Sequence, residues 1–151
     1  FMTARYLGPM IEFTSDLGAI TVDQIQGPFF AGWPDPPSPE RHLEILRGSA
    51  HVALAVHEPD GRVVGFANAI TDGGYMAFIP LVEVVASFQG RGIGSDLVRR
   101  LLDDLSDYYA VDVMCDPELQ PFYRHLGFQP GTGAMWRNYR RQSGGSLGQP
   151  S

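Results

Sequence analysis

The sequence of 151 residues contains no lysine, and all eleven of its basic residues are arginines. A chain without lysine cannot form a lysine Schiff base and cannot supply the lysine of a P-loop. Cysteine is nearly absent as well, because Cys115 stands alone. A single cysteine excludes an internal disulfide, and no group of Cys and His has zinc-site spacing, so we expect an intracellular, cytoplasmic protein without a metal site.

Long apolar runs are also missing. The most apolar stretch, residues 76–86, is interrupted by Pro80 and Glu83 and is too short to cross a bilayer. Seventeen acidic residues outnumber the eleven basic ones, which gives a formal net charge of −6. This charge disfavours a general attraction to nucleic acid or to anionic lipid, so neither partner is expected.

The composition is that of a globular protein, with 44% hydrophobic and 19% charged residues. A chain of this length can bury a core without disulfides or metals. We expect a single domain over residues 2–142. The last stretch, residues 143–151, is rich in Gly, Ser and Pro and is predicted to be a disordered tail.

The order of predicted elements indicates a mixed α/β fold with a central sheet covered by helices. Ser38 and Pro39 mark the start of a helix that should end at Gly48. The first part of the chain is otherwise read as strands at residues 11–14, 51–57, 62–71 and 75–85. The second part is read as a helix at 95–105, a strand at 110–114, a helix at 117–126 and strand pieces at 128 and 134–139.

A glycine-rich turn follows the predicted strand that ends at residue 85. Glycines stand at positions 90, 92 and 94, immediately before the helix. Without side chains, successive backbone N–H groups can converge on an anion, and the helix adds the positive end of its dipole. The turn therefore suits a phosphate or pyrophosphate, but its G-x-G-x-G spacing differs from the G-x-G-x-x-G of dinucleotide-binding proteins.

Two motifs resemble those of the GCN5-related N-acetyltransferases (GNAT). The acyl-CoA signature of that family, Q/R-x-x-G-x-G/A, is matched by Gln89, Gly92 and Gly94. The family's downstream F-Y-x-x-x-G-F segment is matched by residues 122–128. The resemblance covers residues 50–140, and it implies a mostly antiparallel sheet in which strands four and five run parallel and splay apart.

The resemblance also implies acetyl-CoA as the cofactor, bound in that opening. The strand residues Val82, Val84 and Val85 would offer backbone groups to it, and Asp116 stands where many family members have an asparagine that reaches the cofactor. An aspartate there can instead cap the following helix. The pyrophosphate would be held by the turn residues Gln89, Gly90, Arg91, Gly92, Ile93, Gly94 and Ser95.

The reaction implied is transfer of an acetyl group to an amine. Tyr123, in the F-Y segment, would protonate the leaving thiolate, unless it is only a core aromatic. Glu83 is a candidate base, because burial would raise its pKa, although a strand residue can also face solvent or pair with an arginine. Other candidates for the base are bulk water and the histidines His42, His51, His57 and His125.

The acceptor is expected to be a primary amine of a small molecule or amino-acid derivative. Its pocket would be lined by Phe29, Phe30 and Trp33 from a proline-rich loop, and by Tyr75. The same loop can also be packed down by its own rings. A protein or peptide acetyltransferase and a non-catalytic acyl-CoA-binding module stay open as alternatives, as does a homodimer.

Overall fold

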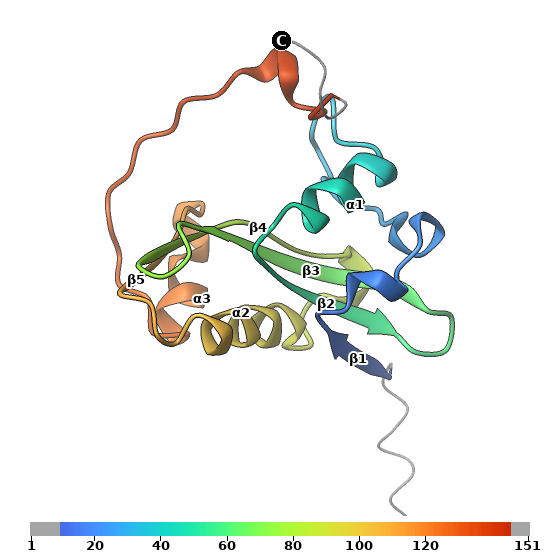
Figure 1. Cartoon of the computed structure of the whole chain (residues 1–151), viewed down its shortest axis with the longest axis horizontal. Coiled ribbons are helices and arrows are strands. Elements are labelled where there is room, and N and C mark those ends of the chain that lie inside the picture. Colours follow the sequence, from blue (N-terminus) through green and yellow to red (C-terminus); the bar gives the residue numbers. More distant parts are fainter. Residues whose placement is uncertain (1–9, 146–151) are drawn as a thin grey trace, which may run out of the picture.

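The computed structural model describes residues 10–145 and has at its centre one mixed sheet of five strands. The strands lie side by side in chain order, and each of the first four is antiparallel to its neighbour. The last strand runs parallel to the fourth, which confirms the predicted mixed architecture (Figure 1). The strands are β1 (Ile11–Thr14), β2 (His51–His57), β3 (Arg62–Thr71), β4 (Met76–Val84) and β5 (Ala110–Val113).

Helices cover both faces of the sheet (Figure 1). Helix α1 (Pro39–Arg47) begins where predicted, because the Ser38 Oγ accepts a hydrogen bond from the Arg41 N–H at 3.0 Å. Helix α2 (Ile93–Asp104) starts two residues earlier than predicted. The predicted helix at 117–126 is divided into η5 (Pro117–Leu119) and α3 (Gln120–His125). The remaining 3-10 helices are η2 (Leu17–Ala19), η3 (Val22–Ile25), η4 (Ala86–Phe88) and η6 (Tyr139–Arg141).

The core forms two layers, one on each face of the sheet. On the face covered by α1, the α1 face, Leu43 and Leu46 pack against Leu54 and Phe66. On the opposite side, the α2 face, Leu97 and Leu101 pack against small residues of β2 and β3. The close approach of α2 depends on Gly65, where an added Cβ would lie 3.1 Å from the Leu97 Cδ1.

Strands β4 and β5 separate half-way along β4. Their pairing runs from Met76 and Ala110 to Ile79 and Val113 and ends there. At this point the register between β3 and β4 also shifts, so that Ile79 and Pro80 together oppose one residue of β3. Beyond it, residues 80–84 of β4 have no strand on their outer edge within the described part of the chain, which is the splayed arrangement expected from the family resemblance.

The predicted strands at Phe128 and at residues 134–139 are wrong. Residues 129–138 form an extended, fully exposed segment, and the chain then enters η6. The local sequence suits a strand, but a ladder also needs a neighbour, and none of the described strands lies beside it. Of the expected C-terminal tail, residues 143–145 lie half-buried after η6, and the rest falls outside the described residues.

None of the helices between residues 10 and 145 combines the length and the apolar character that crossing a membrane requires.

Candidate active site

The glycine turn connects β4 to α2, and no side chain caps the N–H groups at the start of the helix. Gly90 and Gly92 have φ angles of +78° and +83°, in the left-handed region that residues other than glycine rarely adopt. A Cβ at either position would meet no atom within 4 Å, so open space lies beside both. Gly92 is the N-cap of α2 and has no side chain to accept from the first helical N–H groups. The turn therefore fits an anionic group.

The two polar side chains of this turn fold back on the protein. The Gln89 Nε2 donates to the Val84 carbonyl at 2.8 Å, which ties the turn to the end of β4. The Arg91 Nη2 donates to the Ser87 carbonyl at 3.3 Å, and its guanidinium lies 5.4 Å from the centre of the Phe88 ring. Gln89 thus shapes the turn, and the exposed Arg91 adds a positive charge at its rim.

Next to this turn, the outer edge of β4 has no neighbouring strand among the described residues, and of its outward groups the Val84 carbonyl is already used by the Gln89 side chain. The Val85 N–H donates to the Val64 carbonyl at 2.8 Å and is thus used within the sheet. Because successive peptide groups of a strand point to opposite edges, those of Val84 and Val82 face the side that β5 has left. Of the three predicted strand positions, these two valines keep an outward edge, and their side chains pack on the α2 face.

Tyr123 lies in the core on the α2 face of the sheet. It is 7% exposed on α3, with its ring edge-on to Phe122 at 4.9 Å and to Phe128 at 5.4 Å between centroids. Burial, with a smaller contribution from Cys115, raises the pKa of Tyr123 to about 12. Because of this raised pKa, the hydroxyl is protonated at neutral pH. It makes no hydrogen bond to any residue between 10 and 145, so its proton is available for donation.

Phe122 links this tyrosine to the glycine turn. A Cβ on Gly94, in the first turn of α2, would lie 3.6 Å from the Phe122 Cζ, an ordinary packing distance. Tyr123 also shares its core cluster with Val85 and Ile93, which flank the turn. The predicted tyrosine and the predicted phosphate site are therefore held together by packing.

Glu83 lies on the other face of β4. Its Oε1 accepts the backbone N–H of Phe30 at 2.8 Å, although the two residues are 53 positions apart. Desolvation raises the pKa of Glu83, and the Phe30 hydrogen bond opposes this shift in part. The half-buried carboxylate thus lies on the α1 face, where burial favours its protonated form.

The aromatic loop before α1 divides into buried and exposed rings. Phe30 is 4% exposed and Phe29 is half-buried. Both rings contact those of His42 and Phe66, edge-on in three of the four pairs and tilted between Phe30 and Phe66. Trp33 is 38% exposed and lies 5.0 Å from the Phe30 ring. Of the three loop aromatics predicted to bind substrate, Trp33 presents its ring to solvent, whereas Phe29 and Phe30 mainly build the core beside Glu83.

The structure does not bring Tyr75 to this site. Tyr75 precedes β4 and stacks on Tyr109 at 5.1 Å, at the strand end opposite to Glu83. Eight residues of extended strand place the two roughly 26 Å apart. Asp116, predicted near the cofactor, is exposed directly after the β5 end and makes no side-chain capping bond to η5.

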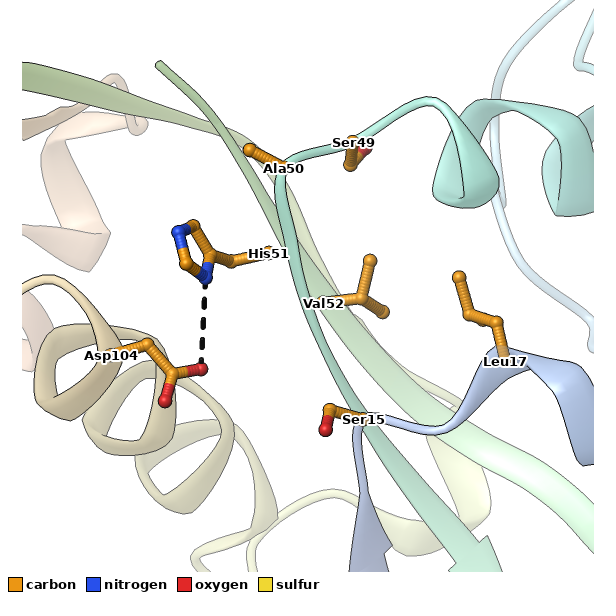
Figure 2. Close-up of a pocket in the computed structure, with 7 residues that line it drawn as sticks. All are labelled: Ser15, Leu17, Ser49, Ala50, His51, Val52 and Asp104. Atoms are coloured by element: carbon orange, nitrogen blue, oxygen red, sulfur yellow. Dashed lines mark ion pairs between the residues drawn. The ribbon is translucent and has the colours of Figure 1, made fainter. Parts of the chain in front are cut away.

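A polar pocket lies away from the glycine turn, at the far end of α2. His51 Nδ1 is 4.0 Å from Asp104 Oδ2 across it (Figure 2). Since α2 has twelve residues, this pocket is roughly 18 Å along the helix from Gly92. His51 thus lies at the end of α2 opposite to the glycine turn. The other lining residues are Ser15, Leu17, Ser49, Ala50 and Val52.

The other three histidines lie in a hairpin, at a helix end and in the core. His57 Nδ1 lies 2.9 Å from Asp60 Oδ1 in the hairpin between β2 and β3, and His125 is exposed at the end of α3. His42 is 1% exposed, and burial lowers its pKa to about 4. Glu83 is thus the one of the predicted base candidates that lies half-buried on β4 where the two strands diverge.

The model of the acetyltransferase (GNAT) family matches residues 20–128, which is most of the chain and includes both motifs. The chain belongs to the GNAT acetyltransferase family. The chain is similar to a protein of Deinococcus radiodurans R1 whose crystal structure is described as that of an inferred acetyltransferase. The two are 43% identical and superpose with a TM-score of 0.85, over 93% of this chain and 94% of the other.

Curated sequences give a similar result over shorter spans. The uncharacterized N-acetyltransferase ycf52 of Porphyra purpurea is 30% identical over 64% of this chain and 58% of its own length. Serotonin N-acetyltransferase 2, chloroplastic, of Oryza sativa subsp. japonica is 39% identical over 60% of this chain and 49% of its own. This GNAT chain thus spans about half to three-fifths of the length of these curated relatives.

Sequence reasoning missed the part that Phe30 plays in this GNAT site. Its ring was expected to line a pocket, whereas its backbone N–H holds the Glu83 carboxylate. Phe30 reaches that position with a φ angle of +61°, which is uncommon for a residue with a side chain. The adjacent Gly27 and Pro28 indicated an irregular loop, but no local pattern predicts a contact over 53 positions.

Proposed function

We propose that this protein transfers the acetyl group of acetyl-CoA to a primary amine of a small molecule or amino-acid derivative, by direct attack of the amine on the thioester. The observation that carries the proposal is the opening beyond Ile79, where β5 leaves β4. The glycine turn lies at its end, Tyr123 packs on the α2 face in the cluster of the residues that flank the turn, and Glu83 lies on the α1 face.

The residues present fit the cofactor that the family uses. The amides that follow Gly92 suit the pyrophosphate, because no side-chain cap competes for them and open space lies beside the turn. The outward peptide groups of Val82 and the outward N–H of Val84 suit the amides of the pantetheine arm, as in strand addition, while the Val84 carbonyl accepts the Gln89 side chain. When bound, acetyl-CoA supplies an activated acyl group on sulfur.

Glu83 would prepare the acceptor. An amine is mostly protonated at neutral pH and has to lose a proton before nitrogen attacks the thioester carbon. The raised pKa of Glu83 makes its carboxylate a better proton acceptor, directly or through water. As the new C–N bond forms, an outward N–H of β4 would stabilise the negative charge on the carbonyl oxygen.

Tyr123 would complete the reaction. Cleavage of the C–S bond leaves a thiolate on CoA, and the Tyr123 hydroxyl would donate the proton it needs. The acid has to stay protonated until that moment, and its pKa of about 12 ensures this at neutral pH. The ammonium loses two protons in becoming an amide: Glu83 accepts the one lost before attack, and the one lost from nitrogen after attack passes to solvent. Tyr123 gives one proton to the thiolate and regains one from solvent, so each turnover that starts from an ammonium releases one proton in all.

The chemistry beside Glu83 supports a small amine as the acceptor. Trp33 presents a partly exposed ring at the edge of the aromatic loop, and the carboxylate adds a negative charge nearby. This combination suits a cationic amine carrying an apolar or aromatic group. The name of the rice relative, which specifies serotonin, supports the same class of acceptor.

Three expectations from the sequence remain proposals. The lone cysteine favours a cytoplasmic location, and the net charge of −6 argues against nucleic acid and anionic membranes as partners. A homodimer is the third.

The test combines acetyl-CoA binding with product formation. Gly92→Glu should abolish CoA binding in calorimetry, because a side chain and a negative charge would enter the phosphate site. Gly73→Glu is a matched control, since Gly73 also has a positive φ of +103° and open space around it but lies in the turn before β4. Retained CoA affinity in Gly92→Glu would show that the phosphate site has been misassigned.

Turnover is then measured as thiol release with a panel of small amines and with peptides. We expect acetylation of small amines, and Tyr123→Phe should lower kcat while leaving the CoA affinity nearly unchanged. Acetylation of peptides alone would identify a protein acetyltransferase. Tight binding of CoA without turnover on any amine would instead identify a binding module.

A further inference from the structure

Strand β1 covers only part of the outer edge of β2. Its ladder ends where Thr14 opposes Leu54. Beyond Thr14 the chain turns away into η2, with Asp16 as the N-cap. No other strand of the described part of the chain lies beside this edge. Residues 51–53 of β2 therefore have an open outer edge.

The peptide groups of Val52 point to that open edge. The Glu58 N–H, directly after β2, donates to the Met10 carbonyl at 2.9 Å, so the peptide groups of Glu58 face the β1 side. In an antiparallel strand these groups alternate between the two edges, residue by residue. Counted back in steps of two, Val52 faces the β1 side as well, and its N–H and C=O have no strand to pair with there among the described residues.

The pocket of Figure 2 lies against this edge and has a volume of about 370 Å³. On one side of β2 the His51 ring points toward α2, and on the other the Val52 side chain points toward Leu17 (Figure 2). Cavities of this size hold ligands in other proteins. Open peptide groups and a cavity thus occur together at this place.

The α2 side of the pocket is suited to a positive charge. Asp104 is the last residue of α2, at the negative end of the helix dipole. Its Oδ2 lies 4.0 Å from His51 Nδ1, and no arginine of the described residues forms an ion pair with it. Arg100, one turn earlier, instead places its guanidinium 4.5 Å from the centre of the Phe13 ring. The carboxylate is therefore available to a cation from outside.

The α1 side of the pocket is suited to an apolar side chain. Val52 belongs to the core layer on the α1 face, and the half-buried Leu17 packs against that layer. The nearby Ser49 hydroxyl is already used, since it donates to the Ile45 carbonyl and accepts from the Asn68 Nδ2, both at 2.9 Å. A polar group would gain little on this side.

We propose that this pocket is a docking site for an extended, basic peptide segment of a partner, which adds as a short strand to the open edge of β2. A peptide residue that pairs with Val52 would place its side chain on the same face, beside Leu17. Its neighbours along the peptide would point to the opposite face, where a basic side chain reaches Asp104. The expected motif is thus an apolar residue flanked by basic ones.

Charge complementarity favours this occupant. The chain has a net charge of −6, and the exposed Asp103 and Asp107 lie close to Asp104 in the sequence. A basic segment is attracted by both the local and the overall charge, whereas an acidic one is repelled. A small cation could pair with Asp104, but it would leave the Val52 peptide groups unused. The site lies at the opposite end of α2 from the glycine turn, and the inference does not depend on the proposed acetyl transfer.

The test uses the capped tripeptide acetyl-Arg-Val-Arg-amide, whose symmetric pattern fits the edge in either strand direction. Binding to the isotope-labelled full chain is followed by the chemical shifts of its backbone amides. We expect the amides of His51 and Val52 to shift with this peptide, and much less with acetyl-Glu-Val-Glu-amide. No shift at residues 51–53 up to the solubility limit of the peptide, or equal binding of the two peptides, would overturn the proposal.

Strand addition is tested on the peptide, so that the protein stays unmodified. N-methylation of the central valine removes the N–H that would donate to the Val52 carbonyl, and it should abolish binding. N-methylation of one arginine, whose N–H would point away from the edge, is the matched control and should preserve binding. Equal affinities of the two methylated peptides would refute strand addition. Free arginine that binds as tightly as the tripeptide would also refute it, because it would reveal a site for small cations.

Asp104→Asn tests the charge contact. We expect the affinity for the tripeptide to fall about two- to fivefold, the scale of an exposed ion pair, and the difference to shrink as salt is added. Asp103→Asn is the matched control, because Asp103 is exposed on the same helix but does not line the pocket. Equal losses in the two variants would assign the attraction to the overall charge and contradict a specific contact with Asp104.

Discussion

His42 should make the protein sensitive to acid, and replacing it with phenylalanine should remove part of that sensitivity. The histidine is 1% exposed on α1, and its Nε2 has no hydrogen-bond partner among residues 10–145. Its ring contacts those of Phe29, Phe30 and Phe66 at centroid distances of 5.3, 4.9 and 4.3 Å. This aromatic environment accepts the neutral imidazole and disfavours the imidazolium.

The magnitude follows from the two pKa values. Burial lowers the pKa of His42 from 6.5 to about 4, so between these values the unfolded chain binds a proton that the folded chain does not. The stabilisation is fully present above the unfolded pKa and is lost as the pH falls toward the folded pKa. At about 1.4 kcal/mol per pH unit, the unfolding free energy falls by about 2 kcal/mol between pH 7 and pH 5.

The assay is urea unfolding of wild type and His42→Phe across this pH range. The wild type should lose about 2 kcal/mol more than the variant by pH 5, equivalent to roughly 4–8 °C in Tm for a chain of this size. His125→Gln, which removes an exposed histidine from α3, is the control and should keep the wild-type slope. If wild type and His42→Phe lose stability in parallel, the burial argument is refuted.

Three further predictions concern packing, capping and the base. Gly65→Ala should lower the unfolding free energy by about 1–3 kcal/mol, because its Cβ would lie 3.1 Å from Leu97 and 3.3 Å from the Glu83 carbonyl oxygen; unchanged thermal unfolding would contradict this packing. Ser38→Ala should cost about 1 kcal/mol in urea unfolding, and a neutral effect would show that the cap is unimportant. In a pH profile of kcat/KM, Glu83→Gln should remove the rise through the elevated pKa of that carboxyl, and an identical profile would exclude Glu83 as the base.

Local patterns in the sequence predicted most of the fold. The N-cap at Ser38, the hairpin of β2 and β3 and the glycine turn before α2 each depend on residues close together in the chain, and the structure has all three. The separation of β4 and β5 was expected from the family motifs. In the structure it coincides with a bulge at Pro80, whose ring removes a backbone N–H.

Long-range contacts account for what the sequence did not predict. Residues 134–139 have the composition of a strand, but a ladder requires a neighbour, which local sequence does not specify. The hydrogen bond from Phe30 to Glu83 spans 53 positions and depends on the path of an irregular loop. Tyr75 has the right chemistry for a substrate pocket, yet it lies at the wrong end of β4.

The central claim is that acetyl-CoA binds at the glycine turn and the adjoining edge of β4. The most direct measurement is thermal unfolding of the purified protein with acetyl-CoA, CoA or NAD. A ligand present at about a hundred times its Kd and bound only to the folded state adds about 2.7 kcal/mol. We predict a clear rise in Tm with acetyl-CoA and with CoA and none with NAD. A rise with NAD alone, or no rise with either CoA compound, would contradict the account.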